Sequence, residues 1–216
     1  MSDVASIIAE DGDKIYSNFT GVWKGGGFKG TWKTGRFVNG RFVDGTWHDG
    51  VWQNGHWYNG EWRSGNWRKG AWLDGNWRGG VWADGVWNNG TWHDGTWKGG
   101  TWLGGTWKQG SWYYGVWEKG VWEDGTWVDG YWYDGVWKNG TWNKGTWRGG
   151  VWQRGIWHGG VWADGMWKDG VWEDGIWSGG EWKGGLWKSG YVISKITGGT
   201  KYSTDCPPVF YAKERC

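Results

Sequence analysis

The sequence predicts an elongated, all-β repeat protein with a tryptophan-lined interior, and three observations support that prediction. First, 32 consecutive pentads run without insertion from Thr31 to Gly190. Second, position 2 of the pentad is Trp in 30 cases and Phe in the other two, Phe37 and Phe42. Third, position 5 is always Gly. A glycine every fifth residue would cost a helix ~1 kcal/mol each time, so a helical repeat is excluded.

Each pentad has the pattern of a short strand followed by a turn. Position 1 is Thr, Val or Ile in 20 of the 32 pentads, and a β-branched residue before an aromatic one favours extended backbone. Position 4 is Asp, Asn or Gly in 23 pentads, and these residues before Gly are typical of a type I′ hairpin. The pattern therefore predicts three-residue strands with Trp on one face and positions 1 and 3 on the other.

Tryptophan supplies most of the apolar surface. The chain has 31 Trp, and Leu, Ile, Val and Phe together also number only 31. Each Trp can bury ~200 Å² at ~25 cal/mol per Å². We expect the core to run the whole length of the array, through Trp32, Trp47, Trp82, Trp102, Trp122, Trp142, Trp162 and Trp187. We expect the position-5 glycines to need positive φ, as at Gly50, Gly100 and Gly150.

A longer period lies within the array. Pentads eight apart bring one column of aspartates into alignment, and "VWADG" recurs unchanged at Val81 and Val161. This spacing divides the array into four 40-residue units and predicts about eight pentads per structural turn. The aligned aspartates are Asp44, Asp84, Asp124 and Asp164.

Two architectures fit that prediction. In the first, an antiparallel meander coils like a tape with its tryptophans inward. In the second, each pentad is one side of a β-solenoid coil. A solenoid would place like charges above one another, and the 40-residue period suggests such a pair in Arg68 and Lys108. Because like charges directly opposite are destabilising, this argument favours the meander.

Three families resemble parts of the array. "GEWRSG" (Gly60 to Gly65) resembles the hairpin core of MORN repeats, although the Tyr-x-Gly start of those repeats is missing. The small residue two positions before a large one resembles the pentapeptide-repeat β-solenoids. The uninterrupted xWxxG array of residues 22–190 is similar to uncharacterised repeat proteins of tailed bacteriophages. This last resemblance implies a role in a virion or in adhesion.

The two ends differ from the array. Residues 1–21 are predicted to form an N-terminal cap with a short helix, because Val4, Ile7 and Ile8 have helical spacing and Gly12 follows as a stop. The array then covers residues 22–190, with one short unit, "GFKG", at 27–30. Residues 191–216 are predicted to form a strand and a loop that cap the array or dock to a partner. Cys206 and Cys216 are either free thiols or the ends of one small loop.

We find no sequence motif for catalysis, and we expect a protein that is not an enzyme and has no cofactor. The four histidines, His48, His56, His93 and His158, are expected on the polar face without a metal site. The turn aspartates resemble those of calcium-binding β-rolls, but their preference for a turn before Gly explains them better, so we expect no metal site.

The sequence predicts a non-enzymatic structural or attachment component, such as a spike, fibre or decoration protein of a phage-type virion. The alternative is a carbohydrate-binding module with exposed Trp faces. A net charge of +2 gives no basic footprint for nucleic acid, and no run of residues is apolar enough for a membrane span. We expect a homo-oligomer that contacts other particle proteins through its ends, with a surface glycan as a further partner. The absence of a signal-like start suggests a virion or, failing that, a cytoplasmic location.

Overall fold

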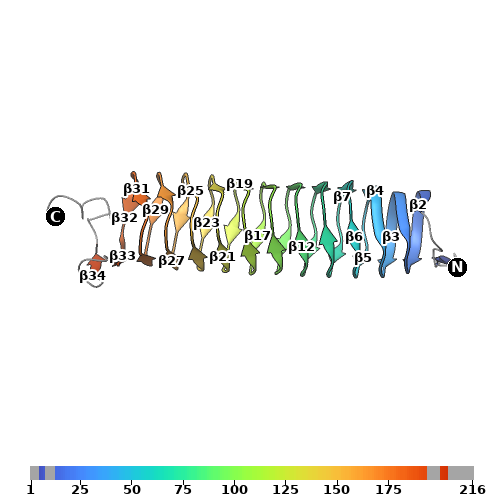
Figure 1. Ribbon diagram of the computed structural model, residues 1–216, viewed down its shortest axis with the longest axis horizontal. Coiled ribbons are helices and arrows are strands. Elements are labelled where there is room, and N and C mark those ends of the chain that lie inside the picture. Colours follow the sequence, from blue (N-terminus) through green and yellow to red (C-terminus); the bar gives the residue numbers. More distant parts are fainter. Residues whose placement is uncertain (1–4, 8–12, 194–199, 204–216) are drawn as a thin grey trace.

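The computed structural model describes the backbone of residues 5–7, 13–193 and 200–203 and the side chains of residues 19–193. These residues form a straight rod of parallel β-coils that contains no helix (Figure 1). The rod has about 12 coils. Because neighbouring strands lie ~4.8 Å apart, the rod is roughly 60 Å long.

The strands are long only at the N-terminal end of the rod. There, β1 (Ala5–Ile7), β2 (Asp13–Trp23), β3 (Gly27–Phe37) and β4 (Arg41–Trp47) precede the regular array. In the array each strand covers positions 1 and 2 of one pentad, and β33 (Ser189–Val192) and β34 (Thr200–Ser203) follow it. The array strands are β5 (Val51–Trp52), β6 (His56–Trp57), β7 (Glu61–Trp62), β8 (Asn66–Trp67), β9 (Ala71–Trp72), β10 (Asn76–Trp77), β11 (Val81–Trp82), β12 (Val86–Trp87), β13 (Thr91–Trp92), β14 (Thr96–Trp97), β15 (Thr101–Trp102), β16 (Thr106–Trp107), β17 (Ser111–Trp112), β18 (Val116–Trp117), β19 (Val121–Trp122), β20 (Thr126–Trp127), β21 (Tyr131–Trp132), β22 (Val136–Trp137), β23 (Thr141–Trp142), β24 (Thr146–Trp147), β25 (Val151–Trp152), β26 (Ile156–Trp157), β27 (Val161–Trp162), β28 (Met166–Trp167), β29 (Val171–Trp172), β30 (Ile176–Trp177), β31 (Glu181–Trp182) and β32 (Leu186–Trp187).

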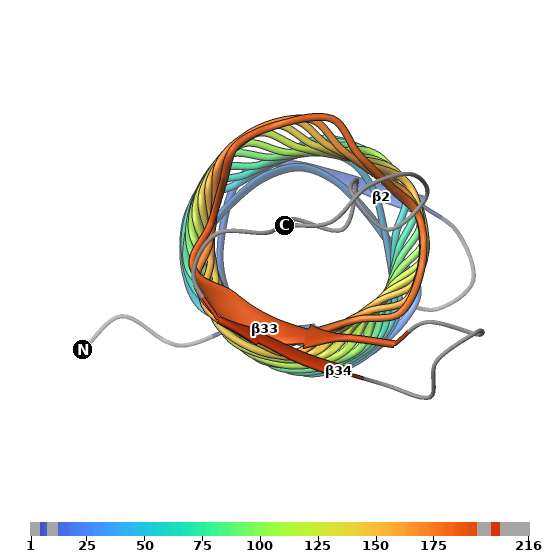
Figure 2. The same ribbon diagram turned by 90° about the vertical axis from the view of Figure 1, so that its left-hand side faces the viewer.

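Three pentads make one coil, and the end view shows these coils as a closed ring (Figure 2). Each array strand pairs in parallel with the strand three pentads away, as in the pair Trp82 and Trp97. The backbone bonds that join coils repeat at the same interval. The Lys98 N–H donates to the Trp82 carbonyl at 2.8 Å, and the Thr101 N–H donates to the Gly85 carbonyl at 2.9 Å.

The β-solenoid is thus confirmed, whereas the antiparallel meander and the turn of eight pentads are wrong. Three inward Trp side chains fill one coil, so the chain closes after three pentads and pairs with the coil below. Eight pentads are not a whole number of three-pentad coils. Residues eight pentads apart, such as Arg68 and Lys108, therefore lie on different faces of the rod.

The corners of the coil are single glycines and not hairpin turns. Gly100 has φ +107°, whereas the preceding Gly99 lies outside the left-handed region. A type I′ turn requires positive φ at both central residues, so the predicted hairpin is wrong. Position 5 is also crowded, because a Cβ on Gly100 would overlap the carbonyl oxygen of Gly85 in the preceding coil. Only glycine satisfies both constraints.

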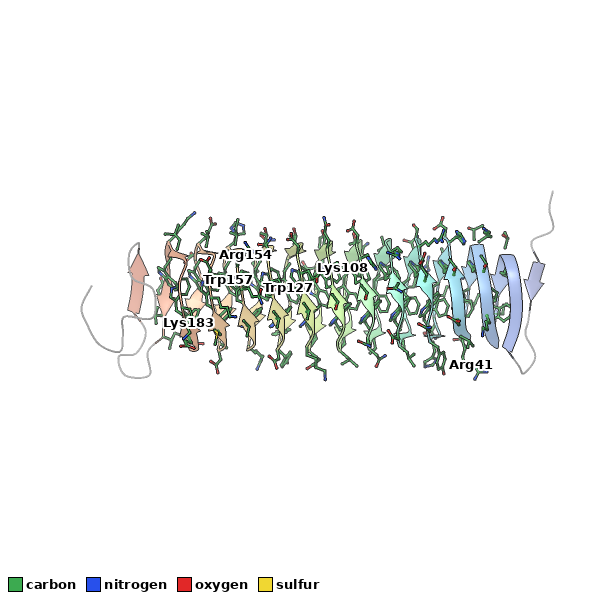
Figure 3. The ribbon with its side chains drawn as sticks, turned by 90° about the horizontal axis from the view of Figure 1, so that it is seen from above. Arg41, Lys108, Trp127, Arg154, Trp157 and Lys183 are labelled. Atoms are coloured by element: carbon green, nitrogen blue, oxygen red, sulfur yellow. The ribbon has the colours of Figure 1, made fainter. Side chains whose placement is uncertain are left out.

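The tryptophans form a continuous interior stack. Trp102 stacks on Trp117 of the next coil with ring centroids 4.8 Å apart and planes 5° from parallel. Within the same coil it meets Trp107 edge to face at 6.0 Å and 75°. Offset stacks and edge-to-face pairs are the favoured aromatic geometries. Trp127 and Trp157 lie inside the rod, whereas Arg41 projects from its surface (Figure 3).

The indole N–H groups are less well satisfied than the rings. Those of Trp132, Trp167 and Trp172 donate to position-4 carbonyls of the next coil at 3.0–3.2 Å. From Trp32 onward, another 25 indole nitrogens are buried and have no hydrogen-bond partner among the described residues. An unsatisfied buried donor costs ~1–3 kcal/mol, so stacking and burial must outweigh that cost in the array.

The two ends of the rod differ from the regular array. Ala5–Ile7 is a strand, β1, which pairs in parallel with β2, so the predicted N-terminal helix is wrong. The short unit "GFKG" lies in a 14-residue coil, because Gly27 pairs with Arg41 before an irregularity restores the 15-residue register. At the other end β33 contains part of the predicted strand and pairs antiparallel with β34. Cys206 and Cys216 lie outside the described residues.

Candidate functional surfaces

The outer surface consists of columns of side chains that repeat every three pentads. Three faces alternate along the chain: face 1 starts with the pentad at Thr31, face 2 with that at Arg36 and face 3 with that at Arg41. Positions 1 and 3 of each pentad lie on a face, and position 4 lies beside the corner glycine. Because the coils are in register, residues three pentads apart are neighbours along the rod.

The residues predicted for the core and the corners lie in those places. The eight predicted core tryptophans have exposed fractions of 0–2%. Gly50, Gly100 and Gly150 have φ values of +126°, +107° and +98°. Every described Trp is at least 96% buried, so the exposed Trp faces of the carbohydrate-binding alternative are not found in this structure.

The large exposed aromatic rings of the rod are tyrosines, and four of them form a cluster. The tyrosine cluster comprises Tyr113 and Tyr114 on face 2 and Tyr131 and Tyr133 on face 3, with exposed fractions of 39–58%. Two shallow clefts share Tyr114: one also contains Tyr131, and the other also contains Tyr113. The cluster was not among the sites predicted from the sequence, although "SWYYG" and "YWYDG" place Tyr at outward positions of pentads only four apart in the chain.

Polar groups surround the tyrosine cluster. Asp129 and Thr146 line the cleft between Tyr114 and Tyr131, and Lys98 lines the other cleft. The Arg148 guanidinium lies 5.1 Å from the centre of the Tyr133 ring, within the range of a cation–π contact. Exposed aromatic rings beside carboxylate and hydroxyl groups can stack on a sugar ring and bind its hydroxyls.

The four histidines do not come together. His48 and His93 lie on face 1, and burial lowers the pKa of both, with neighbouring cations lowering it further. His158 on face 2 lies 2.7 Å from Glu173, measured from Nδ1 to Oε2. Hydrogen bonds from Lys188 and His158 lower the pKa of the Glu173 carboxyl group.

The turn aspartates are bonded to the corners. The Gly85 N–H donates to Asp84 Oδ1 at 2.8 Å, and the same bond recurs at Asp124 and Asp164. The predicted column is also split, because aspartates eight pentads apart lie on different faces. In the part of the chain that the structure describes, no group of three or more His, Cys, Asp or Glu could hold a metal ion.

Comparisons with known proteins add no relative. Neither a protein-family model, nor a curated protein, nor a solved structure matches this chain. The five-residue period in a β-solenoid is consistent with a tryptophan-rich repeat of the pentapeptide type. Within the described residues there is no helix with the length and apolarity that crossing a membrane requires.

Proposed function

We propose that this protein is a non-enzymatic structural or attachment component of a phage-type virion, such as a spike, fibre or decoration protein. The observation that carries the proposal is the in-register stack of near-identical coils. Each coil adds ~4.8 Å, so repeat number sets the length of the rod. Such a rod suits a spacer that holds its two ends a fixed distance apart. On this proposal the protein is located in the virion.

Genomic context tests the virion role directly. We expect genes for particle structural proteins beside the gene for this chain, and we expect the chain among the proteins of purified particles by mass spectrometry. A gene surrounded by those of a metabolic pathway, with no particle genes nearby, would contradict the proposal.

The partners of the rod are proposed to bind at its ends. Inside the array each strand pairs on both sides, whereas β31 and β32 pair on one side only among the described residues. Unpaired strand edges readily accept another strand, so we expect self-association or docking to other particle proteins there. Light scattering at micromolar concentration tests this, and a sharp monomer mass would count against self-association.

A second candidate function is carbohydrate binding at the tyrosine cluster. The exposed rings of Tyr114 and Tyr131 around one cleft are the specific observation that favours it. We expect the double variant Tyr114→Ala/Tyr131→Ala to lose binding on a glycan array. Tyr58→Ala serves as the matched control, because Tyr58 is a 41% exposed tyrosine outside the cluster. Equal loss in the control, or no binding by the parent chain, would remove this candidate.

A further inference from the structure

Face 1 carries an unbroken run of basic side chains. In six successive coils, position 3 of the face-1 pentad is basic, and backbone bonds between position 3 and the Trp carbonyl of the coil before keep the six in one column. The run is about 24 Å long at ~4.8 Å per coil. We call these residues the basic strip: Lys33, His48, Arg63, Arg78, His93 and Lys108.

The fold does not demand this strip. Position 3 has the same backbone environment on all three faces, because each face is built from the same pentad. In the same six coils, face 2 has only two basic residues at position 3, Arg68 and Lys98, and face 3 has none. Stacked like charges are destabilising in a sheet, so packing does not explain why one face collects them.

Three carboxylates lie beside the strip: Glu61 at position 1, and Asp49 and Asp94, which follow His48 and His93 at position 4. Glu61 Oε1 lies 2.9 Å from Arg63 Nε, and its Oε2 lies 3.5 Å from Arg78 Nη2. Arg63 and Arg78 are half exposed, with side-chain exposed fractions of 53% and 49%. Glu61 therefore offsets part of the positive charge and competes with any external anion for both guanidinium groups.

The two histidines make the charge of the strip depend on pH. Burial, then Lys33 and Arg63, lower the pKa of His48, and Glu61 opposes them. Burial, then Arg78 and Lys108, lower the pKa of His93, and Glu61 again opposes them. Both rings are therefore largely neutral at pH 7 and gain a proton only as the pH falls below their ordinary value of 6.5.

We propose that the basic strip binds a linear acidic polysaccharide laid along face 1 of the rod. Charge complementarity identifies an extended polyanion, because the basic side chains form one column along the rod and are evenly spaced as cations when both histidines are protonated. Hydroxyl groups at position 1, on Thr46, Thr91 and Thr106, flank the strip and can bind sugar hydroxyls.

Nucleic acid fits this face less well. Outside the buried Trp, the six pentads contain no Phe, Tyr or Trp, so a single strand would find only the imidazole rings of His48 and His93, three coils apart, on which to stack its bases. The phosphates of a duplex follow two helical paths, and a single column of side chains about 24 Å long meets few of them. The polysaccharide site is independent of the virion role, because it lies on the side of the rod and the proposed particle contacts lie at its ends.

Binding to polygalacturonate tests the proposal, with dextran of similar size as the neutral control. We expect saturable binding to polygalacturonate and none to dextran. The affinity should fall as salt rises, because ion release accompanies polyanion binding. It should increase from pH ~8 to ~5.5 as His48 and His93 become protonated. The carboxylates of bound polygalacturonate also favour the protonated form of both histidines, so binding raises the pKa of each ring.

Two matched double variants locate the site. Arg63→Ala/Arg78→Ala should weaken binding at least about tenfold, since it removes two cations from the strip. Arg36→Ala/Arg68→Ala removes the same charge from face 2 within the same six coils and should leave affinity within about twofold. Glu61→Gln should strengthen binding. All the substituted side chains lie on the surface, so tryptophan fluorescence should show an unchanged core in every variant.

Three outcomes would overturn the proposal: equal weakening by the two double variants, tighter binding to single-stranded DNA than to polygalacturonate, or no binding to polygalacturonate at low salt and pH ~5.5. The first would indicate diffuse charge attraction. The second would indicate that the strip binds nucleic acid. None of these results bears on whether the protein is part of a virion.

Discussion

At the scale of the residue, the interior depends on ring stacking more than on hydrogen bonding. Trp102 lies between Trp87 and Trp117, with centroids 4.8 Å from each, and its indole N–H has no partner among the described residues. Phenylalanine already occupies the same position in the array, where Phe37 stacks on Trp52 at 4.0 Å. The aromatic face is therefore the property that position 2 requires.

We predict that Trp102→Ala lowers the free energy of unfolding by ~3–5 kcal/mol, because it leaves a void in the stack. Trp102→Phe should cost much less, because it keeps a stacking ring and removes a donor that has no partner. Urea denaturation followed by circular dichroism measures both. If the two variants were equally unstable, the indole ring system or its N–H would matter more than stacking does.

Position 5 is expected to be as restrictive as position 2. We predict that Gly100→Val is about as destabilising as Trp102→Ala, because Gly100 has φ +107° and its Cβ would overlap the Gly85 carbonyl oxygen. Lys98→Ala, at an exposed position 3, should change the free energy of unfolding by less than ~0.5 kcal/mol. The same denaturation experiment compares them, and a large effect at Lys98 would mean that position 3 packs inside.

At the scale of the element, the coil is the unit that can be added or removed. Deletion of residues 91–105 removes β13, β14 and β15, and Thr106 then takes the place of Thr91 above Asn76. We predict a shorter rod that still unfolds in one cooperative transition, because each coil contacts only its neighbours. Deletion of residues 91–104 keeps one extra residue at a corner. This deletion should lower the free energy of unfolding by about 2 kcal/mol more than the deletion of residues 91–105 does, because inter-coil hydrogen bonds are lost at about 1 kcal/mol each.

Denaturation of the two deletion variants, with size measured by small-angle scattering, checks this prediction. The natural 14-residue coil at Gly27 shows that an irregular unit is tolerated where strands are long and a bulge can absorb it. The short strands of the array contain no such bulge. Equal stability of the two deletions would show that the array absorbs a register change as readily as the N-terminal coils do.

The properties that could be predicted from the sequence are those that a single pentad shows. The inward Trp and the positive φ at Gly100 follow from the side-chain size and backbone freedom that each position needs, and both are visible in one pentad. The number of pentads per coil is a property of closure, which no single pentad reveals. The recurrence of Asp at Asp44 and Asp84, eight pentads apart, suggested a longer turn, but those residues lie on different faces.

The tyrosine cluster could not be found before the coil length was known. Tyr114 and Tyr131 belong to pentads that are four apart in the chain, and only a coil of three pentads brings them to the same cleft. The basic strip depends on the same coil length, because Arg63 and Arg78 become neighbours only when pentads three apart stack. Surface sites in such an array thus follow from its register, whereas the core follows from composition.

At the scale of the whole molecule, the protein is a rod of stacked 15-residue coils. This arrangement gives one continuous aromatic interior and three independent outer faces. Within each face, side chains three pentads apart form a column with one side chain every ~4.8 Å. Substitutions at these outward positions can therefore build a linear site without altering the core. The rod can therefore carry the proposed end contacts and the proposed lateral sites at the same time.

Engineered disulfides test the three-pentad coil directly. In a chain with Cys206 and Cys216 replaced by serine, Lys98→Cys is combined with Tyr113→Cys, three pentads away, or with Lys138→Cys, eight pentads away. Facing residues of adjacent parallel strands lie ~4.8 Å apart, within the ~4.4–6.8 Å that a disulfide spans between Cα atoms. We expect an intramolecular disulfide on mild oxidation between residues 98 and 113, and none between residues 98 and 138. Cross-linking of 98 to 138 without cross-linking of 98 to 113 would contradict the three-pentad coil.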